Sequence, residues 1–402
     1  VTNQDTPVLL AVVVLAAVIN AFECRGGRGD FADRCAREIL DRMSSRTWFV
    51  TDGTLDAHLR IMAKMRGQEL NLLCLQNDMN PFYLKTVAKL IEEKRLFGPE
   101  NMQRMKSTLD LGVLPFLQDW FAMDREIEKK VAVFGVPDFW YTAGITPVSE
   151  YLFFTGSRNI DEYKGKPLFQ DHMDFWKRMD SVLAPNRKGS DDPTLRHRAH
   201  LRRHMGFVAN NLGVLLEDLG EDEEAYNVYT YVRNVVDPDN ISALFNRFEM
   251  ARGGAKAASA SKEAIERELK DFIGNLKHKY PLWSLSRYYG YVRSPEMFAK
   301  LGWGWALSGQ TGAALAGVRR AINLLPTDQQ TGAMQAMAAI YALADDRVKT
   351  AAVYQDIIKS DPNNRSALLG LARLAVQEGS IDTAKQWLER AAKSEDTRGV
   401  MG

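Results

Sequence analysis

Six residues that could bind a polar ligand follow two predicted strands in the first third of the sequence. Residues 48–51, Trp-Phe-Val-Thr, are aromatic and β-branched, as strands are, and a second apolar run covers 70–75. A helix start with glycine and threonine, as at 53–54, can hold a phosphate, but the two nearby carboxylates oppose an anion unless a metal intervenes. The six candidates that follow these strands are Asp52, Gly53, Asp56, His58, Asn77 and Asp78.

A helix between the two strands would bring these candidates together. Leu55, Leu59 and Met62 recur at helical spacing, so the segment from 48 to 75 is predicted to form strand, helix, strand. Strands joined in this way are parallel, and the loops at their carboxyl ends share one edge of the sheet, where ligands usually sit. We therefore expect the six residues to face a common crevice.

A third strand is predicted at 131–135, and its exit is rich in aromatic residues. Asp138 and Trp140 lie there and could form a stacking platform for a sugar or a base, although such clusters are more often part of a core. Residues 151–154 are a candidate fourth strand. Residues 30–183 are therefore predicted to form a small α/β domain with a parallel, Rossmann-like sheet.

Histidines and arginines gather between 196 and 204. Three histidines at 197, 200 and 204 would share one helix face, as metal ligands can. The neighbouring arginines oppose another cation, and no carboxylate in the same turn could orient an imidazole, so we expect no metal site. The cluster better suits an anion such as a lipid phosphate or a phosphorylated substrate, with a solvated helix face as the alternative. Its members are Arg196, Arg198, His200, Arg202 and Arg203.

The chain beyond residue 184 repeats a helix-turn-helix pattern. Leucine-glycine pairs, turn glycines and small or aromatic residues recur at matching spacings, and the last two copies keep the ~34-residue period of tetratricopeptide repeats. The segment 241–273 resembles a degenerate copy interrupted by the small-residue insert 253–261. We expect an all-α, tetratricopeptide-type solenoid over 184–402, whose concave face binds a protein or peptide partner. The matched positions are Leu212-Gly213, Gly220, Ala225 and Tyr229 against Leu301-Gly302, Gly309, Ala314 and Pro326.

Composition narrows the classes of function. The 402 residues, 46% of them hydrophobic and 26% charged, suit a folded protein of two or three domains. A formal net charge of +1 gives no general attraction to nucleic acid, so we expect no nucleic-acid partner. Dinucleotide-binding, Walker, nucleophile-elbow and zinc-protease motifs do not occur, so no cofactor is expected and catalytic residues are unknown.

The first 29 residues have the pattern of a membrane anchor. Residues 7–22 are apolar except for Asn20, and although about 16 residues are fewer than a spanning helix needs, their content suits a bilayer. A polar, glycine-rich exit follows. We expect 1–29 to be an apolar helix and elbow that attach the protein to a membrane, with a buried core helix or strand as the alternative. Cys24 and Cys35 could pair in an oxidising compartment, whereas Cys74 lies in a predicted buried strand.

The apolar segment 7–22, the segment from Arg46 to Leu59 and the repeats together resemble the carboxyl-terminal half of the DUF2723 family. Those proteins are polytopic membrane proteins, similar to protein O-mannosyltransferases, with a lipid-linked-sugar transferase core followed by an extracytoplasmic domain. The resemblance implies a membrane-associated protein on the extracytoplasmic, periplasmic side. The family's catalytic acidic motif lies in an earlier loop between membrane helices, so no catalytic residue is carried over to this sequence.

Three hypotheses for function follow from these observations. The preferred one is a non-catalytic, extracytoplasmic recognition domain of a membrane-bound glycosyltransferase-like protein, which binds acceptor protein or a partner through its repeats. The second is a tetratricopeptide scaffold whose α/β domain is purely structural. The third is a small enzyme that acts on a nucleotide or sugar phosphate at the α/β crevice, and it requires a well-formed pocket there.

Overall fold

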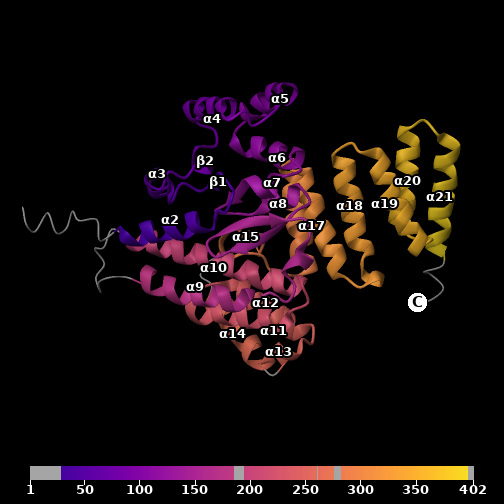
Figure 1. The fold of residues 1–402 in the computed structure, drawn as a ribbon. Coiled ribbons are helices and arrows are strands. Elements are labelled where there is room, and N and C mark those ends of the chain that lie inside the picture. Colours follow the sequence, from indigo (N-terminus) through magenta and orange to yellow (C-terminus); the bar gives the residue numbers. More distant parts are fainter. Residues whose placement is uncertain (1–28, 185–193, 260, 276–281, 397–402) are drawn as a thin grey trace, which may run out of the picture.

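A five-stranded sheet with the order β2-β1-β3-β5-β4 lies at the centre of the first half of the molecule. The structure is a computed structural model that describes residues 29–184, 194–259, 261–275 and 282–396 (Figure 1). β1 pairs in parallel with both β2 and β3, whereas β5 runs antiparallel to β3 and to β4. The strands are β1 Trp48–Thr51, β2 Asn71–Cys74, β3 Val131–Val133, β4 Thr146–Glu150 and β5 Phe153–Ser157.

The sheet is mixed, so the prediction of a parallel, Rossmann-like sheet holds only for β1, β2 and β3. β4 and β5 are joined by Tyr151 and Leu152 alone, a connection too short for a parallel crossover, and Tyr151 adopts φ +61° in the turn. The sequence did not predict β4 because it contains Pro147. β4 is at the edge of the sheet, where a missing backbone N–H is tolerated.

Helices cover both faces of this sheet (Figure 1). Along β1, Phe49 points into one core, whereas Trp48 and Val50 point into the other, as alternating strand side chains do. Burial on both faces explains why the strands have no polar alternation. One face packs against α2 Asp30–Arg42, α3 Asp56–Met65, α9 Leu168–Leu183 and α10 Leu195–Asp218. The other packs against α4 Pro81–Glu93, α5 Pro99–Leu109, α6 Val113–Met123, α7 Ile127–Lys130 and α8 Asp138–Thr142.

The described residues after the sheet form five antiparallel helix pairs, and each pair turns at a residue with positive φ. The turn residues are glycines except at 345, where Asp345 takes φ +54°. Glycine suits this conformation because it has no Cβ. The turn residues are Gly220, Gly254, Gly309, Asp345 and Gly379. The pairs are α10 with α11 Asp222–Tyr231, α12 Ile241–Arg252 with α14 Lys262–Asn275, α16 Pro295–Leu307 with α17 Thr311–Leu324, α18 Thr331–Leu343 with α19 Arg347–Ser360, and α20 Arg365–Gln377 with α21 Ile381–Asp396.

The aligned glycines of the predicted repeats lie where paired helices touch. A Cβ on Gly213 would lie 2.4 Å from the Tyr229 ring, and one on Gly302 would lie 2.8 Å from Val318 Cγ2. Both contacts join residues sixteen positions apart in the sequence, one on each helix of a pair. The close approach of the two helices therefore depends on glycine at these positions.

Helix α10 belongs to both halves of the molecule. It packs against β4, where Ser149 Oγ donates a hydrogen bond to the Val208 carbonyl at 3.0 Å, and it also forms the first helix pair with α11. One buried apolar cluster runs from α2 through α10 into the helix pairs. In Figure 1, α17 to α21 stand side by side and extend away from the sheet. Shorter elements complete the fold: α13 Lys256–Ser259, α15 Leu282–Tyr289, the 3₁₀ helices Leu75–Asn77, Ile160–Tyr163 and Thr327–Gln329, and a π-helical turn Val232–Val236.

The predicted apolar helix at 7–22 lies outside the described residues, as does Cys24 of the suggested Cys24–Cys35 pair. Within the described ranges, no helix has both the length and the apolar character needed to cross a bilayer. Cys35 and Cys74 are both buried, and burial raises the pKa of the Cys35 thiol to about 12.

Candidate functional site

A cavity of about 480 Å³ opens at the carboxyl ends of β1 and β3. The chain runs from β1 outward to β2 and then returns to β3 on the opposite side of β1, so the loops that leave β1 and β3 diverge. Ligands of open α/β sheets bind at such switch points. Residues of α10, α15 and α16 line the opposite wall, so the helix pairs and the sheet form the cavity together.

Asp52 and His200 form the polar pair at the end of β1. His200 Nε2 lies 2.9 Å from Asp52 Oδ2 and 3.1 Å from Thr54 Oγ1, and the Thr54 amide donates to Asp52 Oδ1 at 2.9 Å. Burial alone would raise the pKa of Asp52, but the hydrogen bonds from His200 and Thr54 outweigh it and lower the pKa to about 2. Asp52 is therefore ionised at neutral pH, and its two oxygens are already occupied.

Asp138 lies at the end of β3 and is bonded to a residue from the helix pairs. The Tyr291 hydroxyl donates a hydrogen bond to its carboxylate. Burial raises the pKa of Asp138 to about 6, against the opposing effects of the Tyr291 hydrogen bond and the Arg287 charge. Asp138 thus carries its proton under mildly acidic conditions and is charged at neutral pH.

Aromatic rings form much of the cavity wall. The imidazole of His204 lies on Phe134, with ring centroids 3.8 Å apart, and its Nε2 is 2.8 Å from the Leu152 carbonyl. Burial lowers the pKa of His204 to about 4, so the ring is neutral and donates this hydrogen bond. The other rings that line the cavity are Phe139, Phe207, Tyr288 and Trp305.

Two arginines, Arg203 and Arg287, line the cavity and are exposed. Within the described part of the chain, neither forms a hydrogen bond or an ion pair. Asp78, in contrast, is engaged, because its Oδ1 accepts a hydrogen bond at 2.7 Å from the Leu114 amide at the start of α6. Gln118 donates to Gln310 Oε1 at 2.6 Å and so closes the cavity between α6 and the turn before α17.

Three of the eight ligand-binding candidates from the sequence, Asp52, Asp78 and Asp138, line this cavity, and the other five do not. Asp56 accepts a hydrogen bond from Thr51 Oγ1 at 2.8 Å, and His58 Nδ1 pairs with Asp33 at 2.7 Å. Gly53, at φ +88°, forms the turn after β1. Asn77 is exposed on the 3₁₀ turn, whereas Trp140 is fully buried, with its ring against the space that Gly156 leaves free.

The side chains of the predicted anion patch on α10 do not form one patch in the structure. His200 and Arg203 line the cavity, and Arg196 is exposed. Arg198 is buried, donates to the Val182 carbonyl at 2.6 Å and lies over the Phe31 ring. Arg202 pairs with Asp180 at 2.6 Å. Among the described residues, no three histidine, cysteine or acidic side chains converge as metal ligands would.

Much of the cavity comes from residues that the sequence did not single out. Arg287, Tyr288 and Trp305 are contributed by α15 and α16, more than 150 residues after β3. Their local sequence carries no binding motif, and only the packing of the helix pairs on the sheet places them beside Asp138. Only the three-dimensional structure identifies these three residues as part of the cavity.

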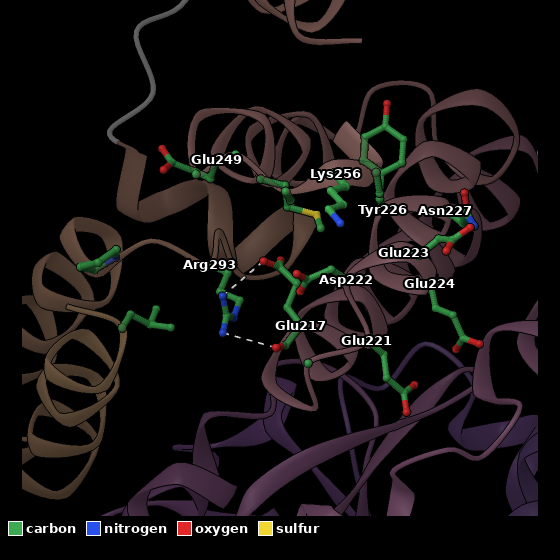
Figure 2. A pocket seen from close by; sticks show the side chains of 18 residues that line it. Glu217, Glu221, Asp222, Glu223, Glu224, Tyr226, Asn227, Glu249, Lys256 and Arg293 are labelled. Atoms are coloured by element: carbon green, nitrogen blue, oxygen red, sulfur yellow. Dashed lines mark hydrogen bonds and ion pairs between the residues drawn. The ribbon is translucent and has the colours of Figure 1, made fainter. Parts of the chain in front are cut away.

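A larger hollow of about 1200 Å³ lies among α11, α12 and the start of α16, and it is strongly acidic. Figure 2 shows Glu217, Asp222 and Glu223 around it, with the Arg293 guanidinium directed at Glu217. Arg293 lies 3.2 Å from Glu217 and 2.8 Å from Asp218. Burial raises the pKa of Glu217 to about 7, against the opposing charge of Arg293. These ion pairs join the end of α10 to the segment before α16.

An apolar groove of about 550 Å³ continues from the cavity along α16. Val136, Arg287 and Trp305 belong to both the groove and the cavity. In the last three helix pairs, the first helix, α16, α18 or α20, exposes large apolar side chains. This set, which we call the inner-face residues, consists of Trp303, Leu307, Leu343, Leu369 and Val376.

A tetratricopeptide repeat family model matches residues 341–398, which include α19, α20 and α21. No curated protein matches the sequence. The match confirms the prediction of tetratricopeptide repeats at the C-terminal end of the chain, and such repeats generally mediate protein–protein interactions. The upstream pairs from α10 to α17 share the same turn geometry. Residues 341–398 are therefore a tetratricopeptide repeat segment. This segment has the architecture of a protein-interaction scaffold.

Proposed function

We propose that this protein is a scaffold that binds an extended segment of a partner protein along the first helices of its last three helix pairs. The inner-face residues carry the proposal, because large apolar side chains that are exposed on three successive first helices mark an interaction surface. Leu307 and Leu343 are 81% and 65% exposed, and each lies two residues before the turn residue of its pair. Concave faces of helical solenoids bind partners through such positions.

The proposal is tested by capturing partners with the full chain and with a charged variant. Leu343→Asp places a charge among the inner-face residues, so we expect it to abolish capture of a partner that the wild type retains. Val348→Asp is the matched control, because Val348 is 82% exposed but lies in the first turn of α19, the second helix of the same pair. Equal capture by the wild type and Leu343→Asp, with both proteins folded, would refute binding at this face.

A finer form of the proposal places the scaffold on the periplasmic side of a membrane, as the non-catalytic recognition domain of a glycosyltransferase-like protein. It is supported by the apolar content of residues 7–22 and by the resemblance of the segment 46–59 to the DUF2723 family. Under this proposal, a periplasm-dependent reporter enzyme fused after Gly402 is active, and deletion of 1–29 releases the protein from membranes. Activity of a cytoplasm-dependent reporter at the same position would contradict it.

A further inference from the structure

We propose that the cavity at the ends of β1 and β3 binds an organic anion with a planar ring, whose phosphate or carboxylate contacts Arg203 and Arg287. This inference does not rest on the scaffold proposal. It concerns the sheet edge and a small molecule, whereas the scaffold proposal concerns the inner-face residues and a protein.

Two arginines in the cavity wall that have no hydrogen-bond partner among the described residues favour an anionic ligand. All three lining carboxylates have partners: Asp52 is bonded to His200, Asp78 to the amide that starts α6, and Asp138 to Tyr291. Arg203 and Arg287 have no hydrogen-bond or ion-pair partner within the described ranges, although both line the same hollow. The groups in the cavity wall that are left without such a partner are therefore the two guanidinium groups, which can donate hydrogen bonds to a ligand. Charge-assisted hydrogen bonds from arginine to phosphate or carboxylate are among the strongest that proteins form.

The wall of the cavity favours a ring over a flexible chain. The Phe134 and His204 rings pack against each other at a tilt of 32°, and four further aromatic side chains line the cavity. Aromatic side chains bind planar groups through stacking, and arginine guanidinium groups can stack on the same rings. Neutral His204 has already used Nε2 on the Leu152 carbonyl, so its Nδ1 is an acceptor and suits a ligand hydroxyl or amine.

Size and position agree with this class of ligand. A volume of about 480 Å³ lies within the usual range for small-molecule sites, and the cavity occupies the point where the strand order reverses. The sheet edge has no glycine-rich phosphate loop, so the two arginines must supply the contacts to the anionic group. A nucleoside monophosphate and an aryl carboxylate both meet these requirements.

The test is isothermal titration calorimetry of the full chain with AMP, adenosine, inorganic phosphate and indole-3-acetate. We expect saturable binding of AMP or of indole-3-acetate, and the tighter of the two identifies the anionic group as phosphate or carboxylate. If AMP is the tighter ligand, adenosine and phosphate alone should each bind at least about tenfold more weakly, because each lacks one half of the recognised chemistry.

Variants locate the binding. Arg203→Gln and Arg287→Gln should each weaken the bound anion by about tenfold or more, and both side chains are exposed, so folding should be unaffected. Val136→Trp, which fills the passage between cavity and groove, should also reduce binding. Arg125→Gln changes an exposed arginine between α6 and α7 and should leave affinity unchanged. Three outcomes would overturn the proposal. The first is that neither AMP nor indole-3-acetate binds, and the second is that both cavity arginine variants bind like the wild type. The third applies if AMP is the tighter ligand, and it is that adenosine or phosphate alone binds as tightly as AMP. Loss of partner capture in Leu343→Asp has no bearing on these results.

Discussion

The guanidinium of Arg320 on α17 lies 2.8 Å from the carboxylate of Asp218, the last residue of α10. The same guanidinium lies over the rings of Tyr141 in α8 and Phe298 in α16, at 4.7 Å and 4.3 Å from their centroids. One side chain therefore joins the sheet half of the molecule, the first helix pair and the third. The position of α16 against the sheet, and with it the shape of the cavity, depends on this contact.

Removal of the Arg320 charge should destabilise the protein strongly. Arg320→Leu removes one of the two ion pairs of Asp218, which keeps its pair with Arg293, and it also removes the contact with Tyr141, so we expect a loss of about 1.5–3 kcal/mol in the free energy of unfolding. Chemical denaturation measures it. Lys300→Ala is the control, since the Lys300–Glu296 pair is exposed and should contribute no more than about 1 kcal/mol. Similar losses in the free energy of unfolding for the two variants would show that the Arg320 contact contributes no more to stability than an exposed ion pair.

Acidification should weaken the fold through His204. Burial lowers its pKa to about 4 from the ordinary 6.5, so the unfolded chain takes up a proton at a pH where the folded one does not. Stability should therefore fall as the pH drops from 6.5 towards 4, by up to about 3 kcal/mol from this residue. His204→Gln should flatten this part of the stability profile, measured by urea unfolding at a series of pH values. A variant profile parallel to the wild type would contradict the assignment.

Asp138 should act in the opposite direction. Its folded-state pKa of about 6 lies above the ordinary 3.8, so the folded protein binds this proton more tightly than the unfolded chain does. The stabilisation is complete below pH 3.8 and is lost as the pH rises through 6. Acidification should therefore stabilise the wild type relative to Asp138→Asn, by about 2 kcal/mol between pH 7 and pH 4. The same unfolding series checks this, and a difference that stays constant with pH would refute it.

Two glycines on one helix should respond oppositely to alanine. A Cβ on Gly302 would lie 2.8 Å from the Ala314 carbonyl oxygen, so Gly302→Ala forces α16 and α17 apart and should destabilise by about 1–3 kcal/mol. Gly304, two residues later in α16, has nothing within 4 Å of a Cβ. Gly304→Ala should instead stabilise by up to about 1 kcal/mol, because alanine favours the helix. Thermal melts of the two variants compare them directly, and a shift in the same direction for both would disprove the close-contact account.

Elements with a strong local pattern were predictable from the sequence. The first three strands follow from short apolar runs, and the helix pairs follow from the spacing of leucine-glycine pairs and turn glycines. β4 was missed because Pro147 weakens a strand pattern locally, although an edge position tolerates it. Trp140 was a candidate stacking platform, but Gly156 leaves room for its ring in the core, and neither residue reveals this contact alone.

The candidate site was predictable only in part, because contacts between residues far apart in the sequence form much of it. Asp52 and Asp138 follow adjacent parallel strands, so topology brings them to one edge. Arg287 and Trp305 reach that edge because α10 packs on the sheet and the Arg320 contact fixes α16 and α17. Such long-range packing leaves no periodic or motif signal near the residues it brings together.

The hollow at the sheet edge originates in the strand order, since the chain leaves β1 in one direction and returns in the other. The backbone therefore provides the opening, and side chains such as Arg203 and Tyr288 decide only what enters it. In evolutionary terms, ligand preference can drift through single substitutions on the rim while the scaffold is preserved. Homologous chains would then be expected to share the opening even where they differ in the molecule that fills it.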